Sequence, residues 1–327
     1  MTTVNTVRGA VDTASLGQVL MHEHVFVLTP EIMLNYGGDY WDEQERVTDA
    51  ISKLRELKAA GIDTIVDPTV LGLGRCIPRI QRVNAELDLN IVVATGLYTF
   101  DQLPHYFQYQ GPGTLFGGPE PLVELFIRDI TSGIGGTGVK AALLKCVVEE
   151  RGLTPDQTRV AKAVAAAHRE TGAPITVHTN SGHQTGRLAL EFFRAEGVDL
   201  TKVVVGHAGD STDLDYLRWI ADQGAIIGCD RFGVDVFNPT ADRIATVAAL
   251  CAEGYADRIV LSHDAACFMD WFSAPHVRQQ VALVVPDWHY LHIPATVVPA
   301  LREAGVTDAQ LHEMLVAVPR RYFEKTS

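Results

Sequence analysis

The sequence has few cysteines, and their spacing fits neither a disulfide framework nor a thiolate metal site. Five cysteines are scattered along the 327 residues, and no CxxC pair occurs among them. Disulfide-rich domains and structural zinc sites both depend on closely spaced cysteines. We therefore expect reduced thiols, most of them buried in the core.

The chain also has no long basic run and no long apolar one. Lysine and arginine number 27 against 40 acidic residues, a formal net charge of −13. A protein that follows a phosphate backbone needs a basic patch, and a membrane span needs about 20 apolar residues. The first twenty residues lack the charged start, apolar block and cleavage site of a secretory signal. We expect a cytoplasmic protein that binds neither nucleic acid nor a membrane.

Segments that would divide the chain are missing as well. No internal repeat, low-complexity tract or Pro/Ser-rich linker occurs. Hydrophobic residues make up 47% and charged residues 20% of the sequence, a composition that supports a large packed core. Because barrels of this length occur as single units, we predict one domain over residues 1–327.

What the sequence does contain is an alternation of strand-like runs with helical stretches. Eight Val- and Ile-rich runs cover residues 18–24, 63–68, 90–96, 141–148, 174–179, 202–207, 225–230 and 258–264. Stretches such as 47–61, 155–172 and 240–254 have apolar residues at every third or fourth position and end on glycine, as helices often do. Apolar strands alternating with helices predict an α/β fold, a (β/α)8 TIM barrel, because parallel strands are buried on both faces. A doubly wound open sheet is the alternative.

Metal-binding residue types stand at the ends of four of these runs. His22 and His24 end the first, and the others are His178, His207 and Asp264. In a barrel the C-terminal strand ends meet at one rim, where active sites lie. Side chains two residues apart share a strand face, so both imidazoles of the HxH motif should reach one point, while Glu23 and His263 should face away. Hydrogen-bonded core histidines are the alternative for each residue taken singly.

Imidazole and carboxylate together suit Zn²⁺, Co²⁺, Mn²⁺ or Fe²⁺. Five such ligands are too many for one hydrolytic zinc ion and too few for two unbridged ions. Lys145 lies inside the apolar run AALLKCVV, where burial drives down the pKa of an unpaired ammonium. A neutral lysine amine can add CO₂ to form a carbamate that bridges two metals. The alternative is that Lys145 extends its ammonium to the surface or forms an ion pair with Glu149 or Glu150.

These motifs carry a family resemblance over essentially the whole chain. HEH at 22–24, Lys145, His178 in VHTNSG, His207 in VGHAGD and Asp264 in LSHD resemble the phosphotriesterase family of the amidohydrolase superfamily, and closely its phosphotriesterase-like lactonase branch. The resemblance implies two divalent ions per chain, Zn, Co, Fe or Mn. His22, His24 and Asp264 would hold the more buried ion, and His178 and His207 the more exposed one. Carboxylated Lys145 and a hydroxide would bridge them.

The resemblance also implies a mechanism and its residues. The exposed metal would bind a lactone carbonyl, the bridging hydroxide would attack it, and Asp264 would pass the proton towards the leaving alkoxide. Tyr98, Arg231 and Trp271 follow strand ends and resemble substrate residues of the lactonase branch. We take Asp264, Tyr98 and Arg231 as candidate catalytic residues, and Tyr98, Arg231 and Trp271 as candidate substrate contacts. Ordinary aromatic packing and a surface or capping arginine are the alternatives.

Aromatic and apolar residues in the segment at about 265–293 predict a lid and an apolar channel for an acyl tail. We expect a lactonase, with N-acyl-homoserine lactones as the favoured substrates, a quorum-quenching activity, and organophosphate triesters as a promiscuous second class. A phosphotriesterase as principal activity is the alternative, and a non-catalytic binder of acylated signals is a distant one. The family precedent and the aromatic stretch FDQLPHYFQY (100–109) predict a homodimer.

Overall fold

Eight parallel strands form one curved sheet in the computed structural model, which describes residues 2–324. Each strand pairs with the next one along the chain, and a hydrogen bond of 3.4 Å from Met21 N to Leu261 O joins the first strand to the last. The strands are β3 (Val19–Leu20), β5 (Thr64–Asp67), β6 (Asn90–Gly96), β7 (Leu143–Val148), β8 (Ile175–Thr179), β9 (Val203–Gly206), β10 (Ile226–Cys229) and β11 (Ile259–Leu261). The sheet is a TIM-type barrel, as predicted.

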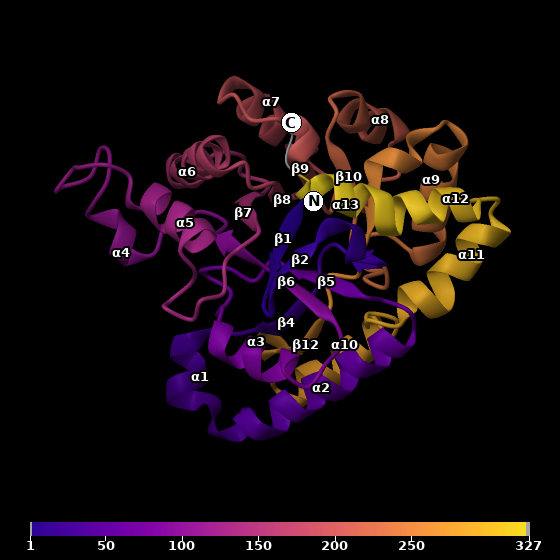
Figure 1. Cartoon of the computed structure of the whole chain (residues 1–327), viewed down its shortest axis with the longest axis horizontal. Coiled ribbons are helices and arrows are strands. Elements are labelled where there is room, and N and C mark those ends of the chain that lie inside the picture. Colours follow the sequence, from indigo (N-terminus) through magenta and orange to yellow (C-terminus); the bar gives the residue numbers. More distant parts are fainter. Residues whose placement is uncertain (1, 325–327) are drawn as a thin grey trace.

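Helices surround this barrel, as the outer ribbons of Figure 1 show. They are α1 (Pro30–Tyr36), α2 (Glu43–Ala59), α3 (Ile77–Asn84), α4 (His105–Gln108), α5 (Pro121–Thr131), α6 (Pro155–Thr171), α7 (Thr185–Ala195), α8 (Leu214–Asp222), α9 (Thr240–Ala252), α10 (Pro275–Val284), α11 (Val298–Glu303), α12 (Asp308–His312) and α13 (Val318–Phe323). None of the described helices is long and apolar enough to span a membrane.

Helix α6 illustrates how the local sequence produces these elements. The Thr154 side chain accepts a hydrogen bond from Gln157 N at the start, and Pro155 occupies the first turn, where its missing N–H is not needed. Gly172 ends the helix in the left-handed conformation with a φ of 71°. Val160 and Val164 are buried against the barrel, so the apolar stripe of the sequence becomes the packed face.

The end of the barrel opposite the strand C-termini is covered by a hairpin that the sequence patterns did not predict. Strands β1 (Thr3–Thr6) and β2 (Gly9–Asp12) pair antiparallel and lie across the centre of the ring in Figure 1. Val7 N donates to Ile91 O near the start of β6. The hairpin leaves the C-terminal strand ends as the end at which a site can open.

The first and last predicted strands are wrong in one respect: each is interrupted. After β3 the chain breaks at residues 21–23 and resumes as β4 (His24–Val27), which pairs with β12 (Ala266–Met269) after a similar break. Asp264, with a φ of 56°, cannot continue a strand. Its N–H nevertheless donates to His22 O. His22 therefore lies outside a regular strand, and a shared strand face does not explain why His22 and His24 converge.

Glu23 occupies the break between β3 and β4 and holds it together. Its buried carboxylate accepts hydrogen bonds from Ser262 Oγ, His263 N, His263 Nδ1 and Ala265 N, at 2.6–3.1 Å. Glu23 and His263 thus face away from the other histidines, as predicted, and His263 contributes a buried structural hydrogen bond. Four bonds to one carboxylate offset the cost of burying its charge.

Candidate metal centre

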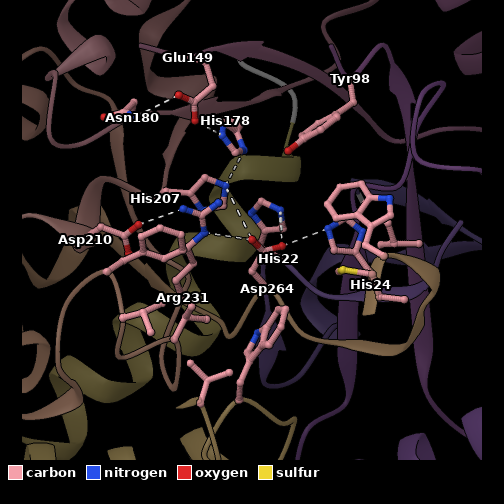
Figure 2. A pocket seen from close by; sticks show the side chains of 18 of the residues that line it. His22, His24, Tyr98, Glu149, His178, Asn180, His207, Asp210, Arg231 and Asp264 are labelled. Carbon is pink, nitrogen blue, oxygen red and sulfur yellow. Dashed lines mark hydrogen bonds and ion pairs between the residues drawn. The ribbon is translucent and has the colours of Figure 1, made fainter. Parts of the chain in front are cut away.

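The six predicted metal ligands meet at the C-terminal end of the barrel. His22 lies in the first strand break and His24 begins β4, Lys145 is in β7, His178 is in β8, and His207 and Asp264 follow β9 and β11. Figure 2 shows five of these side chains directed at one another across the pocket floor. The four histidines of this set and Lys145 are buried. The convergence expected from strand ends is therefore present.

Asp264 lies between the two histidines of the HxH motif. Its Oδ1 is 3.1 Å from His24 Nε2 and 3.4 Å from His22 Nε2. The same His22 Nε2 atom also lies 3.2 Å from the Lys145 Nζ atom. His22, His24 and Asp264 place one ligand atom each within 4.8 Å of one another, a spacing that could hold a metal ion.

His178 and His207 form a second pair beside this group. His207 Nε2 lies 2.9 Å from His178 Nδ1, and the ring centroids of His22 and His207 are 5.0 Å apart. Burial lowers the pKa of His178 to about 4 and holds that of His207 well below its ordinary value, so both rings are neutral at pH 7. Two neutral imidazoles that face each other this closely can both bind a cation.

Asp230 fixes the orientation of two of these rings. Its Oδ2 is 2.8 Å from His22 Nδ1, and its Oδ1 is 3.0 Å from His207 Nδ1. Burial alone would raise the pKa of the Asp230 carboxyl, but the two imidazoles lower it far below its usual range. The carboxylate can only accept, so both Nδ1 atoms carry hydrogen and both Nε2 atoms present lone pairs to the pocket. Asp230, His22 and His207 also place one ligand atom each within 4.8 Å of one another, but the Asp230 oxygens lie on the Nδ1 side of the two rings.

The other two rings have their own partners. His24 Nδ1 donates to Thr69 Oγ1 at 2.7 Å, and Thr69 in turn donates to Asp67. His178 Nε2 donates to Glu149 Oε1 at 2.9 Å, as Figure 2 shows. His178 therefore presents Nδ1 to the pocket, whereas His22, His24 and His207 present Nε2. Imidazoles oriented from behind by carboxylates are a feature of protein metal sites.

Two of the candidate ligands have strained backbones. His207 has a φ of 66° and Asp264 a φ of 56°, and the only other described non-glycine residue with positive φ is Gln184. The left-handed region costs such residues of order 1–3 kcal/mol, and it persists where surrounding contacts enforce it. The bonds of His207 N to Asp230 and of Asp264 N to His22 O enforce it here. Strain concentrated at two such residues is typical of a functional site.

Lys145 has no carboxylate partner among the described ion pairs. Its side chain is 1% exposed, and burial lowers its pKa to about 8. Glu149, a predicted alternative partner, instead bonds His178 and Asn180. A Cβ on Gly96 would lie 1.9 Å from Lys145 O, so glycine lets β6 approach β7 at this point. A buried amine with a lowered pKa is the chemical precondition for carbamate formation.

Arg231 lies between two carboxylates. Its Nε donates to Asp264 Oδ2 and its Nη1 to Asp210 Oδ2, both at 3.1 Å. Burial disfavours the Arg231 charge, but the neighbouring carboxylates outweigh it and raise its pKa above the ordinary value. The guanidinium is therefore always charged, and Arg231 is neither a surface nor a helix-capping residue.

These side chains line the floor of a cavity of about 800 Å³. Tyr98 lies beside the metal-ligand cluster, with its ring centroid 5.5 Å from that of His178. Trp271 lies on the cavity wall, and its ring centroid is 6.5 Å from that of Tyr98. The segment predicted as a lid contains β12, a short helix η6 (Asp270–Phe272) and α10. It contributes the apolar wall, which consists of Met269, Trp271, Phe272, Val281, Val284, Val285 and Trp288.

Sequence patterns missed the residues that orient the ligands. Asp230 ends a predicted strand, and Asp67 lies next to the end of another, so acids at strand ends were the available signal. Two glycines lie next to the Asp230 carboxylate: a Cβ on Gly206 would lie 3.3 Å from Asp230 Oδ2, and a Cβ on Gly228 would lie 2.9 Å from the same oxygen. Small residues on neighbouring strands thus make room for the Asp230 carboxylate inside the barrel. Glu149 carried no comparable signal.

The chemistry of the donor atoms fits a pair of divalent ions. Four imidazoles and one carboxylate converge on the pocket floor, and at least three of the rings present a lone pair fixed by a hydrogen bond behind. His24 is the exception. Burial opposes its charge, but Asp264 and Asp67 raise its pKa to about 9, so a metal would displace a proton from it. Imidazole and carboxylate suit borderline divalent metals.

Comparisons with known proteins identify the family of the chain. A family model described as the phosphotriesterase family matches residues 2–323. The "Phosphotriesterase homology protein" of Mycobacterium tuberculosis is 55% identical over 325 residues, which cover 99% of this chain and 98% of that protein. The "Aryldialkylphosphatase" of Saccharolobus solfataricus is 35% identical over 97% of this chain and 98% of its own.

A solved structure is also similar. The structure titled "Structure of the phosphotriesterase from Mycobacterium tuberculosis" superposes with a TM-score of 0.96 at 55% identity, and the match covers 99% of this chain and 98% of that one. Fold, motif order and whole-length identity lead to the same assignment. The chain belongs to the phosphotriesterase family, a family of hydrolases.

Proposed function

We propose that the protein is a binuclear metal-dependent lactonase whose favoured substrates are N-acyl-homoserine lactones. The observation that carries the proposal is the two-part cavity, with a floor of metal-binding groups and a wall of apolar lid residues. A lactone ring is a compact polar electrophile, and an acyl tail is an apolar chain. The cavity offers each part of such a molecule a matching environment.

The proposed ligand assignment follows the two groups in the structure. His22, His24 and Asp264 would hold one ion, His178 and His207 the other, and carboxylated Lys145 would bridge them. A bound pair of such ions supplies a hydroxide at neutral pH and polarises the electrophile. Zn, Co, Fe and Mn all suit these donors.

The chain's own residues would carry out the remaining steps. Asp264, whose pKa the facing imidazoles and Arg231 hold well below its usual range against the effect of burial, would receive the proton at Oδ1 or Oδ2 and pass it to the leaving alkoxide. Arg231 would keep Asp264 in place. Tyr98 would orient the lactone carbonyl, and Trp271 would exclude water over the ring.

Hydrolysis of organophosphate triesters as the principal activity is the second candidate. The observation that favours it is the 35% identity to the relative named an aryldialkylphosphatase. The same floor would serve both reactions, because both need an activated hydroxide and a polarised oxygen. The apolar lid wall favours the lactone, since a small triester has no long tail to cover. A non-catalytic binder of acylated signals would not need metal-binding groups.

Side-by-side turnover tests the choice. The purified, metal-loaded protein is assayed on a series of acyl-homoserine lactones and on an aryl dialkyl phosphotriester, with chelator-treated protein as the control. We expect a higher kcat/KM on the lactones and no turnover after chelation. Faster phosphotriester turnover would reverse the assignment, and binding without turnover of either substrate would favour the binder.

We also propose a homodimer. Phe100, Tyr106 and Tyr109 of the aromatic stretch are exposed, and an association surface would cover them. Light scattering on an eluting size-exclusion peak should give twice the chain mass of 35.7 kDa. A monomer mass would dispose of this proposal.

A further inference from the structure

Arg243 is a buried charged residue that lies outside the cavity lining yet is bonded to both loops beside Arg231. It is in α9, and its side chain is 2% exposed. A buried guanidinium is expensive unless its donors are satisfied. Here the donors are directed at the loop after β9 and the loop after β10, which carry part of the site.

The bonds of Arg243 join these two loops. Its Nη1 donates to Asp210 Oδ1 at 2.6 Å and to Gly209 O at 3.0 Å, in the loop after β9. Its Nε donates to Asn238 O at 2.9 Å and its Nη2 to Val234 O at 3.4 Å, in the loop after β10. The planar fork of arginine presents five N–H donors in a fixed geometry over a wide span, whereas a lysine ammonium is a compact point charge with three donors on one atom.

The same contacts lead to the reacting end of the cavity. Asp210 uses its other oxygen to accept from Arg231, and Arg231 donates to Asp264. Figure 2 shows this row from Asp210 through Arg231 to Asp264. The Arg231 guanidinium also lies 4.8 Å from the Phe237 ring centroid, and Phe237 belongs to the loop that Arg243 holds at Asn238 and Val234.

We propose that Arg243 is a positioning residue for the reaction. It holds Asp210 and the two loops in one arrangement, and so keeps Arg231 directed at Asp264. Without Arg243, Asp210 has one cationic partner in place of two and three loop carbonyls lose a donor. Arg231 then bonds a carboxylate that is itself less firmly held, and its direction towards Asp264 is less well fixed. The inference rests on the proposed function only for the identity of the reaction.

A double-mutant cycle separates this role from a purely structural one. Arg243→Gln and Arg231→Met are made singly and together, and kcat is measured on whichever substrate the unmodified protein hydrolyses, lactone or phosphotriester. Each single change should lower kcat about tenfold, and the double variant should be no worse than about twofold below Arg231→Met, because residues that act as a unit are not additive. If Arg243→Gln lowers kcat by the same factor in the unmodified protein and in Arg231→Met, the proposal is overturned.

Arg159→Gln is the matched control. Arg159 also joins loop carbonyls, Phe107 O and Gln110 O, to a carboxylate, Glu120, but none of these residues lines the cavity. Arg159→Gln should lower the melting temperature and leave kcat unchanged. If Arg243→Gln is insoluble, Arg243→Lys, which keeps the charge and loses the fork, takes its place in the same cycle.

A second readout needs no activity. Urea unfolding is measured on chelator-treated Arg243→Gln, Asp210→Asn and the double variant. The changes in the free energy of unfolding should not be additive, because the two side chains bond each other. Additive changes would overturn the interaction on which the proposal depends. If no substrate is turned over, the proposed lactonase fails. The unfolding cycle still decides whether Arg243 holds Asp210 in place.

Discussion

The floor and the lid wall of the cavity are built in different ways. Each floor histidine is held by a partner behind it: Asp230 holds His22 and His207, Thr69 holds His24, and Glu149 holds His178. The wall consists of apolar side chains from one segment, and Trp271 is 47% exposed. Helix α10 buries none of its residues. The floor is preorganised for charge, whereas the wall is free to adapt to different substrates.

This difference assigns chemistry and selectivity to separate parts of the chain. Groups on rigid strand ends set catalytic geometry, and loops with few buried contacts tolerate change. Changes to the floor should abolish metal binding and turnover together. Changes to the wall should alter substrate preference and leave the metals in place.

Lys145→Ala should have the largest effect. Removal of the proposed bridge should lower the metal content and reduce kcat/KM by at least ~10³-fold, because a two-metal centre contributes several kcal/mol to the transition state. Metal analysis and turnover are measured on the same sample. Lys202→Met is the control, since Lys202 is also buried but donates to the carbonyls of Arg321 and Tyr322 near the C-terminus. Full activity in Lys145→Ala would refute the bridge.

Asp230→Asn should have the next largest effect. The amide cannot accept from both imidazoles as the carboxylate does, so metal affinity should fall about 10–100-fold, the usual range for such orienting groups. Competition with a chromogenic chelator measures the affinity. Asp129→Asn serves as the control, because Asp129 is a buried carboxylate that bonds Arg75 and Thr95 away from the cavity. Equal affinities for both variants would show that Asp230 does not orient the ligands.

Metal-free Lys145→Met should be more stable than the metal-free unmodified protein at pH 7. Burial lowers the Lys145 pKa from 10.5 to about 8, and each pKa unit corresponds to about 1.4 kcal/mol, so we expect a gain of roughly 1–3 kcal/mol. The sign follows from proton binding. Below pH 8 both states are protonated and the burial cost is complete, whereas between pH 8 and 10.5 only the unfolded state keeps the proton.

The stability difference should therefore shrink as the pH rises through this window and be absent above pH 10.5. Urea unfolding of chelator-treated samples at pH 7, 9 and 10.5 measures it. A difference that does not depend on pH would mean that packing, and not charge burial, separates the two proteins.

Trp271→Ala should have the smallest effect. A half-exposed aromatic side chain contributes about 1 kcal/mol to a contact, so the KM for a long-chain lactone should rise roughly fivefold while the metal content stays the same. Trp219→Ala, on α8 and stacked on Arg187, is the control and should change neither value. Loss of metal in Trp271→Ala would break the separation between wall and floor.

The sequence predicted the floor better than its supports. Strand ends in a barrel meet at one rim, so His178, His207 and Asp264 could be placed together from strand positions alone. The strand breaks at residues 21–23 and at Asp264 could not be predicted, because they depend on Glu23 bonding a segment some 240 residues away. Asp210 and Arg243 were missed for the same reason. Neither lies on a predicted strand, and their role comes from contacts between loops.

The number of divalent ions bound per chain tests the central claim most directly. The protein is expressed in metal-replete medium, purified without chelator, and analysed by inductively coupled plasma mass spectrometry against protein concentration from amino-acid analysis. The six converging donors predict two ions per chain, in agreement with two-metal hydrolytic sites. Fewer than about one ion per chain would contradict a binuclear centre, however well the fold matches its family.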